Sequence, residues 1–181
     1  ISYITSFENA GSIRLDHVTV RRAGRLLRGS GRHAISIRKA KSFEANHLML
    51  ESIENGGHGV SIVDTEEVVL HCSLVTTLNG SGSYSVQAVR GDTVRITNSV
   101  IGQGQNVENS NILRLWDYEE VTVREKTVVN DRATGTFFLF QLGDTMAPPT
   151  MEENVLIGPG NPVAGIEGGF MLPSSNLTAS T

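Results

Sequence analysis

The chain has 181 residues, 39% of them hydrophobic, which is enough for one domain with a sizeable core. The single cysteine, Cys72, excludes an intrachain disulfide and has no partner at a metal-binding spacing. No apolar run approaches the roughly 18 residues of a membrane span, and no basic segment followed by an apolar one opens the chain, so a signal peptide is absent or already removed.

The net charge of -4 is unevenly distributed. Residues 1–50 carry nine Lys or Arg against three acidic residues, and the rest carries six against sixteen, which gives +6 and -10. Nucleic acid is not expected on the basic part, because no aromatic residues are interleaved there for base stacking. An anionic polysaccharide fits that charge at least as well, and a solvated surface is the reading that needs no ligand.

Abundant Gly with many Val, Ile and Thr favours β structure with tight turns. In chain order, residues 1–11 alternate like a strand and predict a partial first coil or the start of an excerpt. Residues 12–142 are expected to form regular coils. Residues 143–181 contain all five prolines and predict a loop, a partial last coil and a frayed polar tail. The whole chain, 1–181, is interpreted as one domain.

A near-constant repeat, with a period in the range of solenoid proteins, runs through the regular part. Five apolar–variable–apolar triplets recur at spacings of 25, 26, 27 and 25: Ile35–Ile37, Val60–Ile62, Val86–Ala88, Leu113–Leu115 and Phe138–Phe140. A second set of apolar pairs follows at Phe43 and Ala45, Val68 and Leu70, Val94 and Ile96, and Val121 and Val123. A third short segment includes Leu48 with Leu50, Leu74, Val100 and Val128. Turns rich in Gly, Asn and Ser close each unit.

Three short strands per unit predict one coil of a parallel β-solenoid, with about 25–27 residues per coil. Alternation places Ile35 and Ile37 inside and Ser36 outside, and the same column in successive coils stacks about 4.8 Å apart. An up-and-down β-sandwich is the competing fold, but it does not predict a sustained repeat. The Leu/Asn signature of leucine-rich repeats is missing.

The stretches "HGVSIVDTEEVVLHCSLV" and "YSVQAVRGDTVRITNSVI" resemble coils of the single-stranded right-handed parallel β-helix, the pectin-lyase-like superfamily. The resemblance covers about residues 12–142. It implies an extracellular or cell-surface/periplasmic protein related to polysaccharide lyases, hydrolases, epimerases, adhesins or phage tailspikes. Fold alone does not choose among them.

The segment Gly57–Gly59 resembles the Gly-His-Gly signature of polygalacturonases, whose His helps to organise the catalytic acids. One coil earlier stand Arg32–Ala34 and one coil later Ser85–Gln87, so the expected Asp pair and Arg-Ile-Lys are missing. Because glycoside hydrolysis needs two carboxyl groups, a polygalacturonase-type hydrolase is disfavoured. The column His33, His58, Tyr84 and Asn111 is interpreted as a polar turn that caps backbone groups, rather than as a metal site.

The outward strand row is the stronger candidate site. Arg38, Val63, Val89, Trp116 and Gln141 form one predicted column, followed by Lys39, Asp64, Arg90, Asp117 and Leu142. The alternating signs of Asp64, Arg90 and Asp117 favour a stacked salt-bridge ladder, which needs no ligand. The functional interpretation is a substrate-binding row of Arg38, Arg90, Arg114, Trp116 and Asp117, because aromatic faces stack on sugars and Arg pairs with carboxylates. Asp64, Asp117 and His58 are weak candidates for catalysis.

Two polar columns follow the second strand. They are Asp16, Asn46, His71, Thr97 and Arg124, and then His17, His47, Cys72, Asn98 and Glu125. Their mixed chemistry favours hydrogen-bonded turns over a metal centre. No metal or other cofactor is predicted, since no acidic cluster supports a Ca²⁺ site.

We therefore expect an extracytoplasmic β-helix that binds or scaffolds an anionic polysaccharide. One alternative is a lyase or epimerase that acts on uronate polymers. Another is a protein that stacks on further copies of itself, or on more coils of a longer chain, through complementary charged ends that lack caps.

Overall fold

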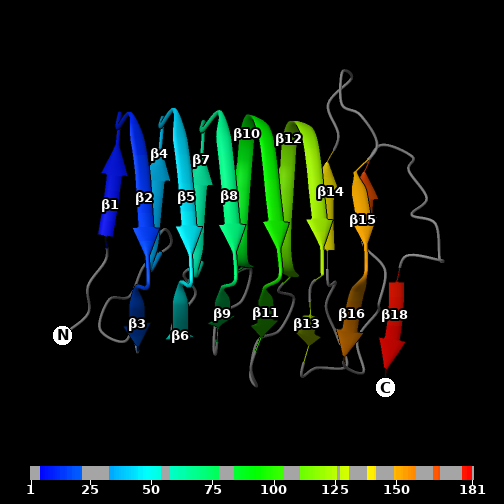
Figure 1. The fold of residues 1–181 in the computed structure, drawn as a ribbon. Coiled ribbons are helices and arrows are strands. Elements are labelled where there is room, and N and C mark those ends of the chain that lie inside the picture. Colours follow the sequence, from blue (N-terminus) through cyan, green and yellow to red (C-terminus); the bar gives the residue numbers. More distant parts are fainter. Residues whose placement is uncertain are drawn as a thin grey trace.

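The computed structural model describes residues 5–21, 33–53, 58–77, 84–103, 111–125, 127–130, 138–141, 149–157, 165–167 and 177–180. These residues are all-β, and their parallel strands stack side by side along a solenoid that runs from the N-terminal to the C-terminal end (Figure 1). The predicted fold class is therefore confirmed.

Successive coils place their strands in three rows. The first row holds β1 (Thr5–Glu8), β4 (Ile35–Arg38), β7 (Val60–Val63), the first halves of β10 (Tyr84–Thr97) and β12 (Asn111–Arg124), β14 (Phe138–Gln141) and β17 (Gly165–Glu167). The second row holds β2 (Ser12–Asp16), β5 (Ser42–Asn46), β8 (Glu67–His71), the second halves of β10 and β12, and β15 (Thr150–Glu152). The third row holds β3 (Thr19–Arg21), β6 (Met49–Ile53), β9 (Leu74–Thr77), β11 (Val100–Gln103), β13 (Thr127–Asn130), β16 (Asn154–Ile157) and β18 (Leu177–Ser180).

The register of the first row reproduces the predicted repeat. Ile35 pairs with Val60, Val60 with Val86, Val86 with Leu113, and Leu113 with Phe138. In the second row, the apolar pairs at Phe43, Val68, Val94 and Val121 are likewise aligned. Because parallel pairing joins residues one coil apart, the sequence spacing is the coil length, and the predicted 25–27 residues hold from β4 to β14. The coil is longer where Ser12 pairs with Ser42, 30 positions later, and where Thr122 pairs with Thr150, 28 positions later.

Two details differ from the expectation of three short strands per coil. β10 and β12 each run through 14 residues, because pairs such as Gly91 with Tyr118 continue their ladder around the corner. In the third row the buried column is Leu50, Val75 and Ile101, whereas Val100 is 38% exposed. The sequence prediction, which names Leu74 and Val100 for this row, is therefore one residue too early in these two coils.

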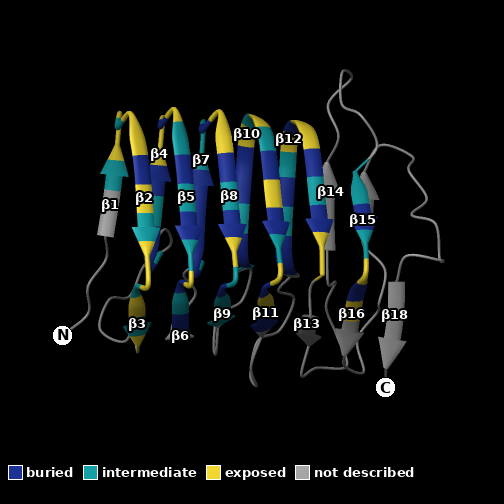
Figure 2. Cartoon of the chain, in the orientation of Figure 1, coloured by how far each residue is buried: buried dark blue, intermediate teal, exposed yellow. Residues whose placement is uncertain are grey.

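The core is a set of apolar columns inside the coils (Figure 2). Ile37, Ala45 and Leu50, one from each row of the same coil, are 0% exposed. Burial of such side chains stabilises each coil only when a neighbouring coil covers it, so the columns must be continuous.

Single residues in the left-handed conformation form both corners. The first corner, between the first and second rows, uses Asn9, Lys39, Asp64, Arg90 and Asp117, with φ between 53° and 63°. The second corner, between the second and third rows, uses His17, His47, Cys72, Asn98, Glu125 and Glu153, with φ between 46° and 54°. At these corners backbone amides still donate to the next coil, as from Asp64 to the Val89 carbonyl at 2.9 Å. This hydrogen bonding offsets the cost of a positive φ in residues with a Cβ.

A buried tyrosine crosses a coil just inside the first corner. Tyr118 is 0% exposed, and its hydroxyl donates to the Thr65 carbonyl two coils away, at 3.4 Å. Gly91 stands between them in the intervening coil, where a Cβ would lie 2.5 Å from Cε1 of Tyr118 and collide with the Thr65 carbonyl oxygen. The absence of a side chain at Gly91 therefore makes room for the ring.

Candidate functional site

The outer face of the first row carries the columns proposed for binding. Arg38, Val63, Val89 and Trp116 pair in register, as predicted. A second outward column runs through Ser36, Ser61, Gln87 and Arg114. This face is not uniformly open, because Ser61 is 4% and Val89 9% exposed, whereas Arg114 and Trp116 are half-buried.

Arg114 joins two aromatic rings on this face. Its guanidinium carbon lies 4.0 Å from the centroid of the Trp116 ring and 5.4 Å from that of Tyr84. A guanidinium at this distance over an indole ring is attracted by the negative face of the ring. Arg114 and Trp116 were predicted from the sequence, whereas Tyr84 was seen only as a turn residue. Nothing in the sequence shows that the ring of Tyr84 reaches Arg114 in the outward column of the neighbouring coil.

Two polar atoms in the middle of this face have no hydrogen-bond partner in the described part of the chain. They are Nε of Arg114 and Oε1 of Gln87, both buried, and the two residues are register neighbours in β12 and β10. Unpaired buried polar atoms are uncommon, because they lose water without compensation.

His58 belongs to a stacked column beside this face. Its ring is parallel to that of His33, with centroids 4.6 Å apart, and is tilted against Tyr84 at 5.1 Å. The backbone amide of Tyr84 donates to Nδ1 of His58 at 2.9 Å, and that of His58 donates to Nδ1 of His33 at 3.2 Å. The interpretation as residues that cap backbone groups is therefore confirmed for His33 and His58, and the side chain of Asn111, the fourth member of the predicted column, is not described.

The pKa of His58 is lowered to about 3, mainly because burial disfavours the charged ring, with smaller contributions from His33 and Arg114. The pKa of His33 is lowered by burial and by Arg38. With Nδ1 accepting a backbone hydrogen bond, neutral His58 carries its proton on Nε2. That arrangement suits a structural acceptor and not a proton-transfer group at neutral pH.

Asp64, Arg90 and Asp117 follow one another at the first corner. Nε of Arg90 lies 2.5 Å from Oδ1 of Asp64, an ion pair between two adjacent coils. The hydrogen bond from Arg90 lowers the pKa of Asp64, and Arg90, Lys39 and Arg38 lower it further. Asp117 is exposed and contributes to the raised pKa of Arg90, after Asp64. Asp64 is thus a paired carboxylate that stays ionised, which disfavours it as a general acid.

A groove of about 410 Å³ lies elsewhere, over the second row, and the sequence did not predict it. It is lined by Ser12, Lys41, Ser42, Glu66, Glu67, Asp92, Thr93 and Arg95. Its lining mixes both signs of charge and carries no aromatic residue, so it offers no platform for a sugar ring.

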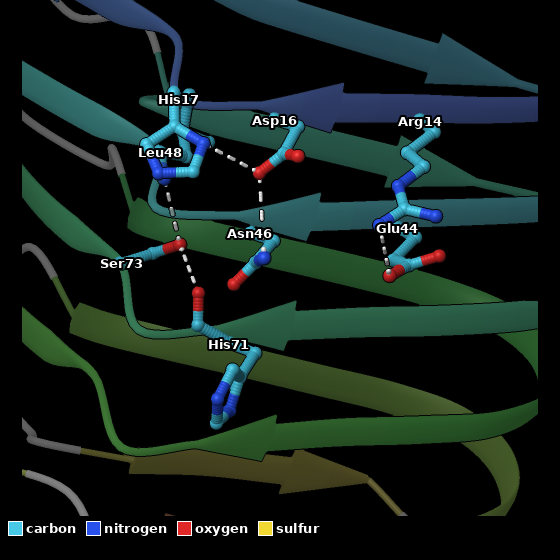
Figure 3. A network of polar contacts seen from close by, with 8 residues as sticks. All are labelled: Arg14, Asp16, His17, Glu44, Asn46, Leu48, His71 and Ser73. Atoms are coloured by element: carbon cyan, nitrogen blue, oxygen red, sulfur yellow. Dashed lines mark hydrogen bonds and ion pairs between the residues drawn. The ribbon is translucent and has the colours of Figure 1, made fainter.

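The second corner is a network of polar contacts (Figure 3). Nδ1 of His17 lies 2.9 Å from Oδ1 of Asp16, and the amide of Asn46 donates to the same oxygen at 3.3 Å. Inside the corner, Oγ of Ser73 accepts from the Leu48 amide at 3.1 Å. The predicted hydrogen-bonded turns are confirmed, with serine ladders inside and ionisable groups outside.

Comparisons with known protein families, with curated proteins and with solved structures gave no match to this chain. The fold and the contacts described above therefore carry the functional argument. Among the described residues there is no helix long and apolar enough to cross a membrane.

Proposed function

We propose that the protein binds an anionic polysaccharide along the outer face of its first row of strands. The cluster of Arg114, Trp116 and Tyr84 carries this proposal. An indole and a phenol present apolar faces to sugar rings, and a guanidinium held between them pairs with a carboxylate or sulfate.

The electrostatics of the face support an anionic ligand. Burial is the main cause of the lowered pKa values of His33 and His58, and Arg38 and Arg114 lower them further. The hydrogen bond from Arg90 is the main cause of the lowered pKa of Asp64, to which Lys39 and Arg38 contribute. The contributions of these basic side chains have the sign of a positive local potential. A polymer that follows the solenoid axis would meet a new coil about every 4.8 Å, so its charges could contact several coils.

Binding without catalysis is the form of this proposal that the side chains favour. Asp64 is engaged by Arg90, and Nδ1 of His58 is engaged by a backbone amide. A lyase or epimerase needs a free base at the α-carbon of a uronate, and neither group is free to take that role. Asp117 is the remaining weak catalytic candidate.

Membership of the right-handed pectin-lyase-like superfamily and an extracellular, cell-surface or periplasmic location are parts of the same proposal. They agree with the parallel solenoid and with a glycan partner. Stacking on further copies stays a prediction, because four of the basic residues of the N-terminal part of the sequence, Arg22, Arg25, Arg28 and Arg32, lie outside the described residues.

The test compares matched arginine variants for binding to polygalacturonate and alginate, with neutral dextran as the reference glycan. Arg114→Gln removes the charge and keeps a long polar side chain, so we expect a Kd about tenfold higher, equivalent to about 1.4 kcal/mol. Arg14→Gln is the control. Arg14 has a 63% exposed side chain in the second row and only a 3.8 Å contact with Glu44, so its loss should leave the Kd within about twofold.

Trp116→Leu is expected to weaken binding by a similar factor. Added salt should raise the Kd of the wild-type protein for the uronate polymers without unfolding the protein. Circular dichroism of each variant checks that the solenoid is intact. Equal affinity of the wild type, Arg114→Gln and Trp116→Leu for both uronate polymers would exclude this face as the binding site.

A further inference from the structure

The second corner gathers three side chains with metal-ligand chemistry at its N-terminal end. One ligand atom each from Asp16, His17 and His47 lies within 4.8 Å of the others, and all three residues are exposed. The imidazoles of His17 and His47 are stacked, with centroids 4.5 Å apart and planes inclined by 13°. Among the described residues this is the one such group of three or more.

The backbone fixes this proximity. His17 and His47 are equivalent left-handed corner residues of adjacent coils, with φ of 53° and 54°. The amide of His17 donates to the Asn46 carbonyl at 3.0 Å, and β2 and β5 pair Asp16 with Asn46. The two rings are therefore held one coil spacing apart by a hydrogen-bonded ladder, on a rigid part of the fold.

We propose that Asp16, His17 and His47 form a binding site for a divalent transition metal, with Zn²⁺ as the expected ion. Two imidazoles and a carboxylate are a ligand set that zinc uses in open sites, where a fourth position is left to water or an external ligand. The hard ions Ca²⁺ and Mg²⁺ are disfavoured, because they take oxygen ligands. The site lies at the second corner, between the second and third rows, and the proposed glycan face is the outer face of the first row.

Binding requires only side-chain movement. Bonds of about 2.0–2.1 Å to a tetrahedral ion place ligand atoms about 3.4 Å apart. Ligand atoms within 4.8 Å of one another thus need to approach by about 1.4 Å at most. The parallel rings must tilt so that their in-plane lone pairs converge on one point. Asn46, which donates to the Asp16 carboxylate at 3.3 Å, would orient that ligand, as hydrogen-bonded neighbours do in known metal sites.

The other three histidines use Nδ1 in contacts with groups that are not metal ligands, whereas Nδ1 of His17 lies 2.9 Å from Oδ1 of Asp16, another member of the proposed site. His33 and His58 use Nδ1 to accept backbone amides, and Nδ1 of His71 is 2.7 Å from Oγ1 of Thr97. Cys72 is the corner residue one coil beyond His47, and its Sγ accepts a hydrogen bond from the side-chain amide of Asn98 at 3.1 Å. All five histidines of the chain are thereby placed, and two of them converge with a carboxylate.

The experiment is a calorimetric titration of the full chain, prepared without a histidine tag, with ZnCl₂. We expect one ion per chain. His17→Asn and His47→Asn are the test variants, because asparagine tolerates a positive φ, and each should raise the Kd at least about tenfold. Asp16→Asn should raise it as well. His71→Asn and Cys72→Asn are the matched controls from the same corner region, and they should bind within about twofold of the wild type.

A second measurement identifies the ligands in the unmodified protein. The electron paramagnetic resonance spectrum of bound Cu²⁺ should report two nitrogen ligands, because copper prefers the same imidazoles. Unchanged Zn²⁺ affinity in His17→Asn and His47→Asn would overturn the proposal. So would an equal loss in His71→Asn or Cys72→Asn, or a copper spectrum without nitrogen coordination.

Discussion

Replacement of Gly91 by alanine tests the packing that lets Tyr118 cross a coil. The added Cβ would lie 2.5 Å from Cε1 of Tyr118 and would overlap the Thr65 carbonyl oxygen. The Thr65 carbonyl belongs to the backbone, which pairs with adjacent coils, and the Tyr118 ring is buried, so neither neighbour can move aside at little cost. Overpacking of this kind typically costs about 1–3 kcal/mol, and we expect the upper part of that range, since the ring that would have to move is 0% exposed.

The assay is urea unfolding followed by the fluorescence of Trp116, the only tryptophan, which lies in β12 beside the altered contact. Gly11→Ala is the matched control, because nothing lies within 4 Å of its added Cβ. It should be neutral, or stabilising by up to about 1 kcal/mol through a less flexible unfolded chain. Equal midpoints for Gly91→Ala and the wild type, or an equal loss in Gly11→Ala, would refute the packing argument.

Three further predictions concern the interior, pH and chemistry. Ser73→Ala should lower the free energy of unfolding by about 1–3 kcal/mol in urea titrations, because the buried Leu48 amide loses its acceptor at 3.1 Å; Ser12→Ala, at an exposed site, should not. Since the pKa of His58 falls to about 3 on folding, unfolded chains bind its proton first, and stability should decline as pH falls below 6.5. His58→Gln should reduce that decline between about pH 5.5 and 6.5, where unperturbed carboxylates are almost fully ionised, and His33, whose pKa is also lowered by burial, should account for the decline that remains; an unchanged slope would contradict the assigned burial of His58. Incubation with uronate polymers should release no ultraviolet-absorbing unsaturated product, and its appearance would favour a lyase.

The columns along the solenoid could be predicted from the sequence, because in-register parallel pairing turns a spacing into a contact. The near-constant spacing of the apolar triplets thus predicts from the sequence alone that Arg38, Val63, Val89 and Trp116 form one column, as the strand register confirms. The error in the third row arose where the repeat has few marker residues: Leu74 and Val75 are both apolar, so periodicity alone could not choose the inward one.

Contacts between columns were not predictable in the same way. Alternation gives the direction of a side chain within a strand, but each left-handed corner residue resets that direction for the residues after it. The rotamers that place Arg114 on Trp116, and Tyr118 beneath Gly91, depend on the space left by several coils at once. The sequence showed these residues without showing which would touch.

By itself, the sequence determined the coil length from Ile35 to Phe138, the columns of the first and second rows and the all-β class, since hydrophobic periodicity and chain continuity are local properties. Only the tertiary structure decided that His17, His47 and Asp16 converge, that His58 serves as a backbone acceptor, and that Asp64 forms an ion pair with Arg90. Those outcomes depend on burial, on side-chain rotamers and on corner geometry, which are set by neighbours a full coil away along the chain.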